Sequence, residues 1–121
     1  MKRFLSVMVV LCLTGLCVAE VRTKDVTYSD GDVELRGYLA WDDAHAAADD
    51  QAPGVLIVHQ WMGLTEYEKT RARQLAKLGY VAFALDVYGV DNRPSNREES
   101  GKLSGKFKSD RKLFRKRLNL G

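Results

Sequence analysis

Two short groups of residues, each following an apolar run, have the composition of a chemical site. The loop His59-Gln60-Trp61-Met62-Gly63 follows the apolar run 55–58, and Asp86 to Tyr88 follows the apolar run 80–85. Runs of this length and composition predict buried strands. In an open α/β sheet ligands bind beyond the carboxyl ends of the strands. We therefore expect both groups at the functional rim of a parallel sheet.

A helix must connect these two runs. Thr65 and Glu68 form the spacing of a capping box, and Gly79 stands where the chain would leave the helix. A strand, helix and strand in this order form a right-handed crossover, which makes the two strands parallel. The sequence thus predicts a βαβ unit. His59 is expected to be a hydrogen-bonded structural residue at the strand end, and Asp86 is expected to fix the loop that follows it.

The segments around this unit predict further elements. Residues 21–28 and 33–41 read as two strands joined by an Asp-Gly turn, which indicates an antiparallel entry hairpin. Residues 42–52 are acidic and rich in alanine without helical periodicity, so they predict an exposed connection. The histidine and aspartates of this connection could bind a metal ion only with a fixed geometry, and a solvated loop is expected instead. No metal and no organic cofactor are predicted.

A helical region is expected at the carboxy-terminal end. Ser95 and Glu98 repeat the capping-box spacing, and Ser109 could begin a second helix. Four apolar residues fall close to one stripe of this region: Leu103, Phe107, Phe114 and Leu118. Residues 97–121 hold 9 Lys and Arg against 3 Asp and Glu. Few aromatic side chains are interleaved with these charges, so we expect a solvated helix face and no nucleic-acid partner.

The first 19 residues predict a secretory signal peptide. Lys2 and Arg3 precede an apolar stretch at 4–16, and Cys17-Val18-Ala19 resembles a cleavage site. Cleavage would leave a domain of residues 20–121 that is periplasmic or secreted, with no stable membrane anchor. A retained amino-terminal anchor is the alternative. Both cysteines, Cys12 and Cys17, lie in this segment, so the mature chain would have no thiol chemistry.

No complete hydrolase site is visible in the sequence. A serine or cysteine hydrolase of the α/β type needs G-x-S-x-G or G-x-C-x-G between a strand and a helix. The nearest string runs from Gly101 to Gly105, but its serine is misplaced and no strand precedes it. The loop from His59 to Gly63 instead suits the other half of such a site, because the loop after the first parallel strand supplies one oxyanion-hole N–H.

The sequence resembles the dienelactone hydrolase family of α/β-hydrolases in three places. These are G-Y-L-A at 37–40, H-Q-W-M-G-L after V-L-I-V, and L-G-Y-V-A-F-A-L-D-V-Y-G at 78–89. The resemblance implies that Trp61 donates its backbone N–H to the oxyanion and that Gln60 lies beside the nucleophile. His59, Met62, Gly63 and Tyr88 would lie adjacent to the active site. A cysteine nucleophile, an aspartate and a histidine would follow Gly121, outside this chain.

Two positions depart from the family pattern. The dienelactone enzymes have a glutamate where this chain has Gln60, and an amide cannot accept a proton. They also have an arginine that binds the substrate carboxylate where this chain has Val90, with Arg93 three residues on. The resemblance therefore does not extend to dienelactone as the substrate.

The sequence as a whole predicts an α/β protein with a partial α/β-hydrolase sheet: an antiparallel hairpin, a parallel βαβ unit and a carboxy-terminal helical region. The implied function is hydrolysis of a small-molecule ester or lactone through a covalent acyl-enzyme, with this chain as an inactive amino-terminal part. The alternatives are a non-catalytic binding protein and a non-functional truncated reading frame. We also expect the strand at 80–85 to be an open edge of the sheet, which would make the isolated chain marginal or aggregation-prone.

Overall fold

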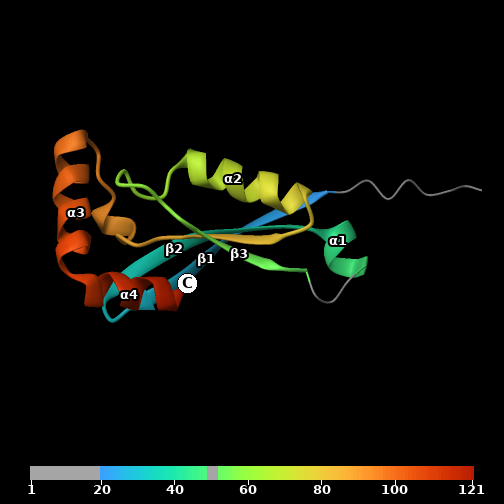
Figure 1. Cartoon of the computed structure of the whole chain (residues 1–121), viewed down its shortest axis with the longest axis horizontal. Helices are drawn as coiled ribbons and strands as arrows, with labels where there is room; N and C mark the ends of the chain where they lie inside the picture. The colour runs from blue at the N-terminus through green and yellow to red at the C-terminus, as the bar shows by residue number, and fades with distance from the viewer. Residues whose placement is uncertain (1–19, 49–51) are drawn as a thin grey trace, which may run out of the picture.

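The computed structural model describes residues 20–48 and 52–121, so the predicted signal peptide lies outside the described residues. Helix α2 lies on one face of a single sheet, α4 lies under the other face, and α3 stands across one end (Figure 1). The elements follow one another as β1 (Val21–Asp30), β2 (Val33–Asp42), α1 (Asp43–Ala48), β3 (Gly54–Val58), α2 (Glu66–Lys77), β4 (Val81–Leu85), the short 3-10 helix η1 (Val90–Asn92), α3 (Arg97–Ser109) and α4 (Arg111–Leu120).

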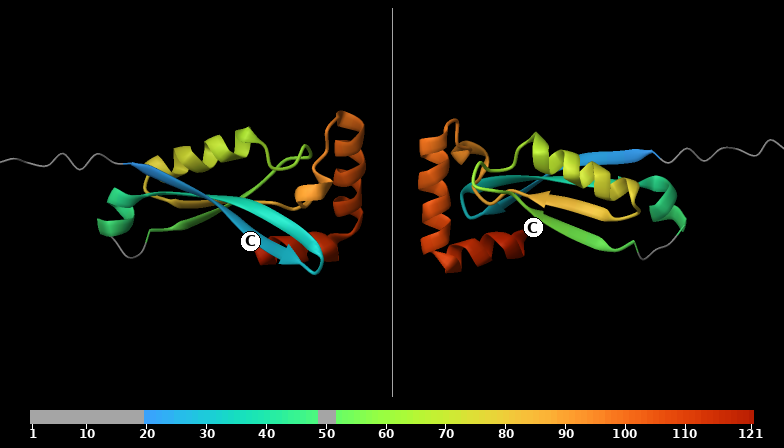
Figure 2. Two further views of the ribbon diagram at one scale, coloured as in Figure 1. Left: turned by 180° about the vertical axis from the view of Figure 1, so that it is seen from behind. Right: turned by 45° about the horizontal axis from the view of Figure 1, so that its top comes forward.

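The sheet has four strands in the order β1-β2-β4-β3. Strands β1 and β2 form the predicted antiparallel hairpin, and β3 pairs with β4 in parallel as the βαβ unit requires. The prediction that the strand at 80–85 is an open edge is wrong, because β2 pairs with β4 in antiparallel orientation and leaves β4 inside the sheet. Within the described residues the edge strands are β1 and β3, whose positions Figure 2 shows from two further sides.

Helix α2 begins and ends where its signals predict. The Thr65 side chain caps the helix, and the Glu68 carboxylate accepts a hydrogen bond of 2.9 Å from the Thr65 backbone N–H. At the other end Gly79 has a φ of 93°, which glycine adopts without strain. The buried face of α2 consists of small side chains, Ala72 and Ala76, that let the helix lie close to the alanines of β2 and β4.

A second apolar cluster lies at the carboxyl end of β4. Leu85, Val87 and Tyr88 are buried there together with Phe107. The four predicted stripe residues of α3 and α4 all belong to this cluster, which confirms the stripe: Leu103, Phe107, Phe114 and Leu118. This cluster attaches the two terminal helices to the functional rim of the sheet.

Three local predictions differ from the structure. Residues 43–48 form helix α1 where an exposed connection was expected, because Asp42 accepts a hydrogen bond from the Ala44 N–H and starts the turn. The cap of α3 is Asn96, one residue later than predicted, since its side chain accepts a hydrogen bond from Glu99. The cap of α4 is Asp110, again one residue later.

Within residues 20–48 and 52–121, no helix combines the length and apolar character needed to cross a membrane. The same described part of the chain contains no cluster of three or more side chains that could hold a metal ion. His45 Nδ1 does lie 3.4 Å from the Asp42 carboxylate at the start of α1. The aspartates at 49 and 50, which were considered as metal ligands with them, lie outside the described residues.

Candidate active site

His59 holds the rim of the site together through both ring nitrogens. Its Nε2 accepts a hydrogen bond of 3.1 Å from the Val87 backbone N–H, which joins the ends of β3 and β4. A backbone amide can only donate, so Nε2 carries no proton and Nδ1 carries it. Nδ1 then donates to the Gln60 carbonyl oxygen at 2.7 Å. Burial lowers the pKa of His59, which favours this neutral ring. The structural role predicted for His59 is confirmed.

The loop after β3 is a tight turn that orients the Trp61 backbone. Gly63 donates its N–H to the Gln60 carbonyl oxygen at 3.0 Å, and Gly63 has a φ of 86°. The Gln60 oxygen therefore accepts from both Gly63 and His59. In a trans peptide the N–H points away from the preceding C=O, so these two bonds also fix the direction of the Trp61 N–H. Within the described residues this N–H has no hydrogen-bond partner.

Tyr88 fixes the other side of the same turn. Its hydroxyl donates to the Trp61 carbonyl oxygen at 2.9 Å, and its ring meets the His59 ring edge-on with centroids 4.7 Å apart. Tyr88 is buried, and this burial raises the pKa of its phenol. It therefore stays protonated and can act as a donor at neutral pH. Both peptide groups that flank Trp61 are thus anchored by side chains of the rim.

A pocket of about 270 Å³ opens beside this turn. Its wall combines the predicted rim residues with the inner faces of α3 and α4, and most of it is apolar or aromatic. The lining residues are His59, Gln60, Trp61, Val87, Tyr88, Ser104, Phe107, Lys108 and Phe114. Four of the residues predicted near the site therefore meet in one pocket. Met62 and Gly63 belong to the turn but do not line the pocket.

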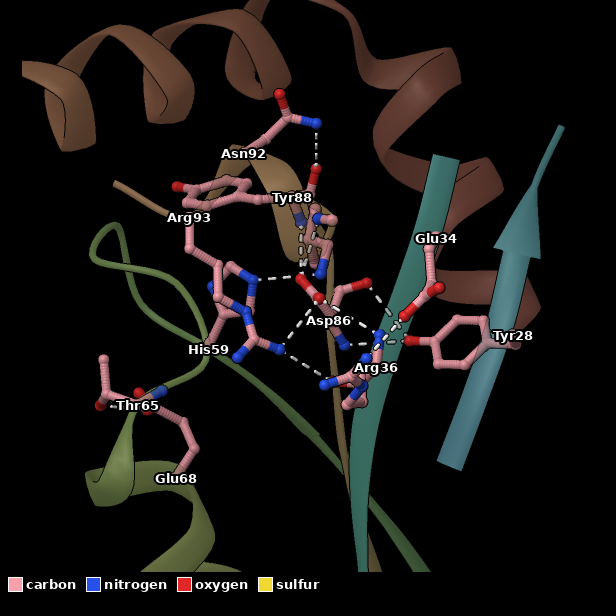
Figure 3. Close-up of polar contacts among 12 residues, drawn as sticks. Tyr28, Glu34, Arg36, His59, Thr65, Glu68, Asp86, Tyr88, Asn92 and Arg93 are labelled. Carbon is pink, nitrogen blue, oxygen red and sulfur yellow. Dashed lines mark hydrogen bonds and ion pairs between the residues drawn. The ribbon is translucent and has the colours of Figure 1, made fainter. Parts of the chain in front are cut away.

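Asp86 fixes the loop after β4, as predicted. One carboxylate oxygen accepts hydrogen bonds from the Tyr88 and Gly89 backbone N–H groups at 3.1 and 3.0 Å. The other accepts from the Arg36 backbone N–H and from the Arg93 guanidinium, each at 3.3 Å. Figure 3 shows Asp86 at the centre of these contacts. The side chain is fully buried, so it has no access to a substrate.

Arg93 belongs to this network and not to the pocket. Besides Asp86 it contacts the Arg36 carbonyl oxygen at 3.2 Å, and it does not line the pocket next to Trp61. In this position Arg93 ties the loop after β4 to strand β2.

Two residues that the sequence analysis missed anchor the hairpin to the rim. The Tyr28 hydroxyl donates to the Asp86 carbonyl oxygen at 3.2 Å and accepts from the Asp86 N–H at 2.9 Å. Arg117 is buried in α4, where it donates to the Asp30 carboxylate at 2.7 Å and to the Val87 carbonyl oxygen at 3.0 Å. A basic tail predicts solvated arginines, and no sequence signal distinguishes Arg117 from its exposed neighbours.

The described residues contain no nucleophile in the position that the fold requires. Ser104 lines the pocket, but it lies in the middle of α3 and not on a turn between a strand and a helix. This agrees with the rejection of the Gly101–Gly105 string. The described residues contain no cysteine. What the chain does provide is a fixed backbone N–H beside an apolar pocket, which is the arrangement of one half of an oxyanion hole.

Comparisons with known proteins agree with this arrangement. The sequence profile described as dienelactone hydrolase family matches residues 35–119. A curated relative, the putative hydrolase fragment YghX of Escherichia coli (strain K12), is 34% identical over 87 residues, which cover 69% of this chain and 72% of that protein.

Solved structures extend the comparison to the fold. A structure named m3DLH has a TM-score of 0.70 and 27% identity, and covers 81% of this chain and 41% of its own. The dienelactone hydrolase-like promiscuous phosphotriesterase P91, from metagenomic libraries, has a TM-score of 0.71 and 29% identity, over 83% of this chain and 40% of its own. This chain thus spans about two fifths of these solved structures. Because the family profile covers most of the sequence, the chain belongs to the dienelactone hydrolase family.

Proposed function

We propose that this chain is the amino-terminal part of a hydrolase that cleaves a small-molecule ester or lactone through a covalent acyl-enzyme. The observation that carries the proposal is the fixed direction of the Trp61 N–H. His59 and Gly63 hold the Gln60 carbonyl oxygen, and the Trp61 N–H lies on the opposite side of that peptide without a partner in the described residues. A preorganised donor of this kind stabilises the negative oxygen of a tetrahedral intermediate.

The roles of the chain follow from this placement. A nucleophile would attack the ester carbonyl carbon, the carbonyl oxygen would become negative, and the Trp61 N–H would donate a hydrogen bond to it. The aromatic wall formed by Tyr88, Phe107 and Phe114 would hold the apolar part of the substrate. The intermediate would collapse, break the bond to the alcohol oxygen (opening the ring of a lactone) and leave the acyl group on the nucleophile. Water would then attack the acyl-enzyme, and the acid and the free nucleophile would be released. No metal or organic cofactor has a role in this proposal.

We assign the nucleophile and its base to residues that this sequence does not contain. His59 cannot act as the base, because both of its ring nitrogens are already used. Gln60 offers an amide where a carboxylate would activate a thiol, so activation must come from elsewhere in the completed domain. The chain alone would then bind substrate weakly and turn it over negligibly.

The direct test is to complete the domain. The full chain, with the carboxy-terminal part of P91 that it does not match joined after Gly121, should hydrolyse an activated aryl ester. Trp61→Pro removes the N–H, and proline suits the second position of a β-turn. It should lower kcat by about 10²–10³-fold, as loss of one oxyanion donor does. The control Trp61→Phe keeps the N–H and should retain kcat. Equal activity of the two variants would contradict the proposed role.

The chain alone provides a second test. With a panel of activated aryl esters, the 121-residue chain should show no turnover above buffer, and His59→Ala should change nothing. Turnover that His59→Ala abolishes would show that a catalytic site exists within the chain and that the assignment of the nucleophile is wrong. Tight binding of an ester without turnover would favour the alternative of a non-catalytic binding protein, because a partial catalytic site should bind its substrate only weakly.

We also propose that the chain is exported. The proposal is supported by the charged start, the apolar stretch and the small residues before Glu20 in the sequence. Amino-terminal sequencing of the protein from the cell envelope or the medium should give a chain that starts near Glu20. A chain that keeps Met1 and stays in the cytoplasm would contradict export.

A further inference from the structure

Arg117 is a buried cation in a helix whose other basic side chains are exposed. Its side chain and that of Asp30, at the end of β1, are each 6% exposed. Hydrogen bonds from Lys116 and Arg117 lower the pKa of Asp30, so the carboxylate is ionised at neutral pH. A buried ion pair adds little net stability, because the loss of hydration offsets most of the attraction. The pair therefore has to be explained by what else the guanidinium holds.

The guanidinium also holds the backbone at the rim of the site. Besides the Asp30 carboxylate, it binds the Val87 carbonyl oxygen, to which Nη1 donates at 3.0 Å. The Val87 N–H donates to His59 Nε2 at 3.1 Å. The Val87 backbone is thus fixed from two sides, by α4 and by the residue that follows β3. A displacement of the guanidinium would move Val87 and, with it, the acceptor position of the His59 ring.

His59 passes this constraint to the turn that carries the oxyanion donor. Its Nδ1 donates at 2.7 Å to the Gln60 carbonyl oxygen, which belongs to the same peptide group as the Trp61 N–H. Four hydrogen bonds, none longer than 3.1 Å, therefore run from β1 to this peptide, through Asp30, Arg117, Val87, His59 and Gln60. The direction of the Trp61 N–H depends on every member of this series.

Aromatic packing supplies a second link between Arg117 and the same turn. The guanidinium carbon lies 5.9 Å from the centroid of the Phe107 ring, and the Phe107 and Tyr88 ring centroids are 5.3 Å apart. Tyr88 in turn donates to the Trp61 carbonyl oxygen. Phe107 and Tyr88 also line the pocket. Arg117 therefore fixes the Trp61 turn relative to the wall against which a substrate would lie.

We propose that Arg117 is a positioning residue for the Trp61 oxyanion donor, an inference that rests on the proposed function of that N–H. Arg117 does not line the pocket next to Trp61, so it acts through Val87 and not on the substrate. The chemistry of its side chain suits the task. A guanidinium donates in two fixed directions from one rigid plane, whereas a lysine carries all its donors on one atom of a flexible stem. A lysine at position 117 would keep a cation beside Asp30 without holding Val87 in the same geometry.

A mutant cycle tests this role in the completed chain, the fusion with the carboxy-terminal part of P91. Arg117→Lys should lower kcat for an activated aryl ester by about tenfold, less than loss of the donor itself, and should leave KM nearly unchanged. Arg115→Lys, the same change at an exposed arginine of α4, should keep kcat. In the Trp61→Pro background no N–H remains to be positioned, so Arg117→Lys should lower kcat no further. An equal loss in both backgrounds, or no loss in either, would overturn the proposal.

The chain alone provides a test without turnover, which separates a failure of this inference from a failure of the proposed function. Burial lowers the pKa of His59, and the Val87 N–H at Nε2 opposes a proton there. By NMR titration the His59 pKa should rise in Arg117→Lys and stay unchanged in Arg115→Lys. The other histidine, His45 in α1 at the opposite end of the sheet, is the internal reference (Figure 1). If the completed chain shows no turnover, this titration decides, and an unchanged His59 would contradict the positioning role.

A second variant covers the case that Arg117→Lys does not fold. Asp30→Asn keeps an oxygen that can accept from the Arg117 Nε and removes the charge that orients the guanidinium. In the same cycle and the same titration it should give changes of the same sign and smaller size. If Asp30→Asn matched the unsubstituted chain in both kcat and the His59 titration, the proposal would be wrong.

Discussion

Strands β4 and β3 are neighbours in one sheet, but their surroundings differ. Beyond β4, the buried Asp86 carboxylate receives four hydrogen bonds, and Tyr28 and Arg117 add contacts from the hairpin and from α4. The outer side of β3 has Leu56 and Val58 half exposed and no strand partner in the described part of the chain. The rim of the site is thus fixed by contacts within this chain, and it does not depend on what covers β3.

Because of this difference, the rim of the site can be stable in this chain although the sheet has no strand beyond β3 in the described residues. The Trp61 turn follows β3 itself, but His59 bonds it to the Val87 N–H after β4 and Tyr88 donates to its Trp61 carbonyl oxygen. A missing neighbour at β3 would therefore affect association and solubility first. The geometry of the proposed oxyanion donor should persist in the chain alone.

The largest effect should follow from opening the Asp86 network. Asp86→Ala leaves the Arg36, Tyr88 and Gly89 backbone N–H groups without their acceptor and removes the carboxylate partner of Arg93. We expect a loss of about 3–5 kcal/mol in the free energy of unfolding, as for a broken buried charge network. Urea denaturation measures it. The control is Asp91→Ala, an exposed aspartate in η1, which should change little. Equal stability of the two variants would mean that the network does not hold the rim.

A matched pair of leucines should show the contrast between the strands directly. Leu85→Ala in β4 removes a fully buried side chain, and we expect it to cost about 2–5 kcal/mol. Leu56→Ala in β3 removes a side chain that is 47% exposed, and it should cost less than half as much in dilute protein. Thermal unfolding of both variants at low concentration provides the comparison. An equal or larger loss for Leu56→Ala would show that the Leu56 side chain is already buried within the chain alone.

A smaller effect should appear as a pH dependence from His59. Its folded-state pKa lies below the ordinary value of 6.5, mainly because of burial. The unfolded chain therefore binds a proton that the folded chain refuses, and stability falls as pH decreases from about 6.5 toward the lower folded pKa. The slope cannot exceed about 1.4 kcal/mol per pH unit for one group. Urea midpoints between pH 7.5 and 5 should show this slope, and His59→Gln should lose it. An unchanged slope would assign it to another group.

Local signals in the sequence predicted much of this fold. The capping box of Thr65 and Glu68, the Asp-Gly turn and the two apolar runs each depend on neighbouring residues, and the structure confirms all of them. Cap positions were predicted less well at α3. There Ser95 and Asn96 both precede a glutamate by three residues, and the structure selects Asn96. Overlapping signals of equal strength cannot be separated without the packing of the helix.

Long-range pairing could not be predicted in the same way. Which of two parallel strands lies inside the sheet depends on where β2 attaches, and nothing in the composition of β3 or β4 specifies this. The burial of Arg117 likewise depends on Asp30, which is distant in sequence but lies beside α4 in the fold. For the site, the residues around Trp61 could be located from the sequence. The anchoring of its turn by His59 and Tyr88 required the structure.

Amide hydrogen exchange on the chain alone tests the central claim most directly, namely that the rim is rigid while the Trp61 N–H is held free. The amides of Val87, Tyr88 and Gly89, which donate to His59 and Asp86, should exchange slowly, close to the rate set by global unfolding. The Trp61 amide, in the turn that follows β3, should exchange rapidly. Strong protection of the Trp61 amide would show that it is already engaged, and rapid exchange of Val87 to Gly89 would show that the rim is not fixed; either result would contradict the account.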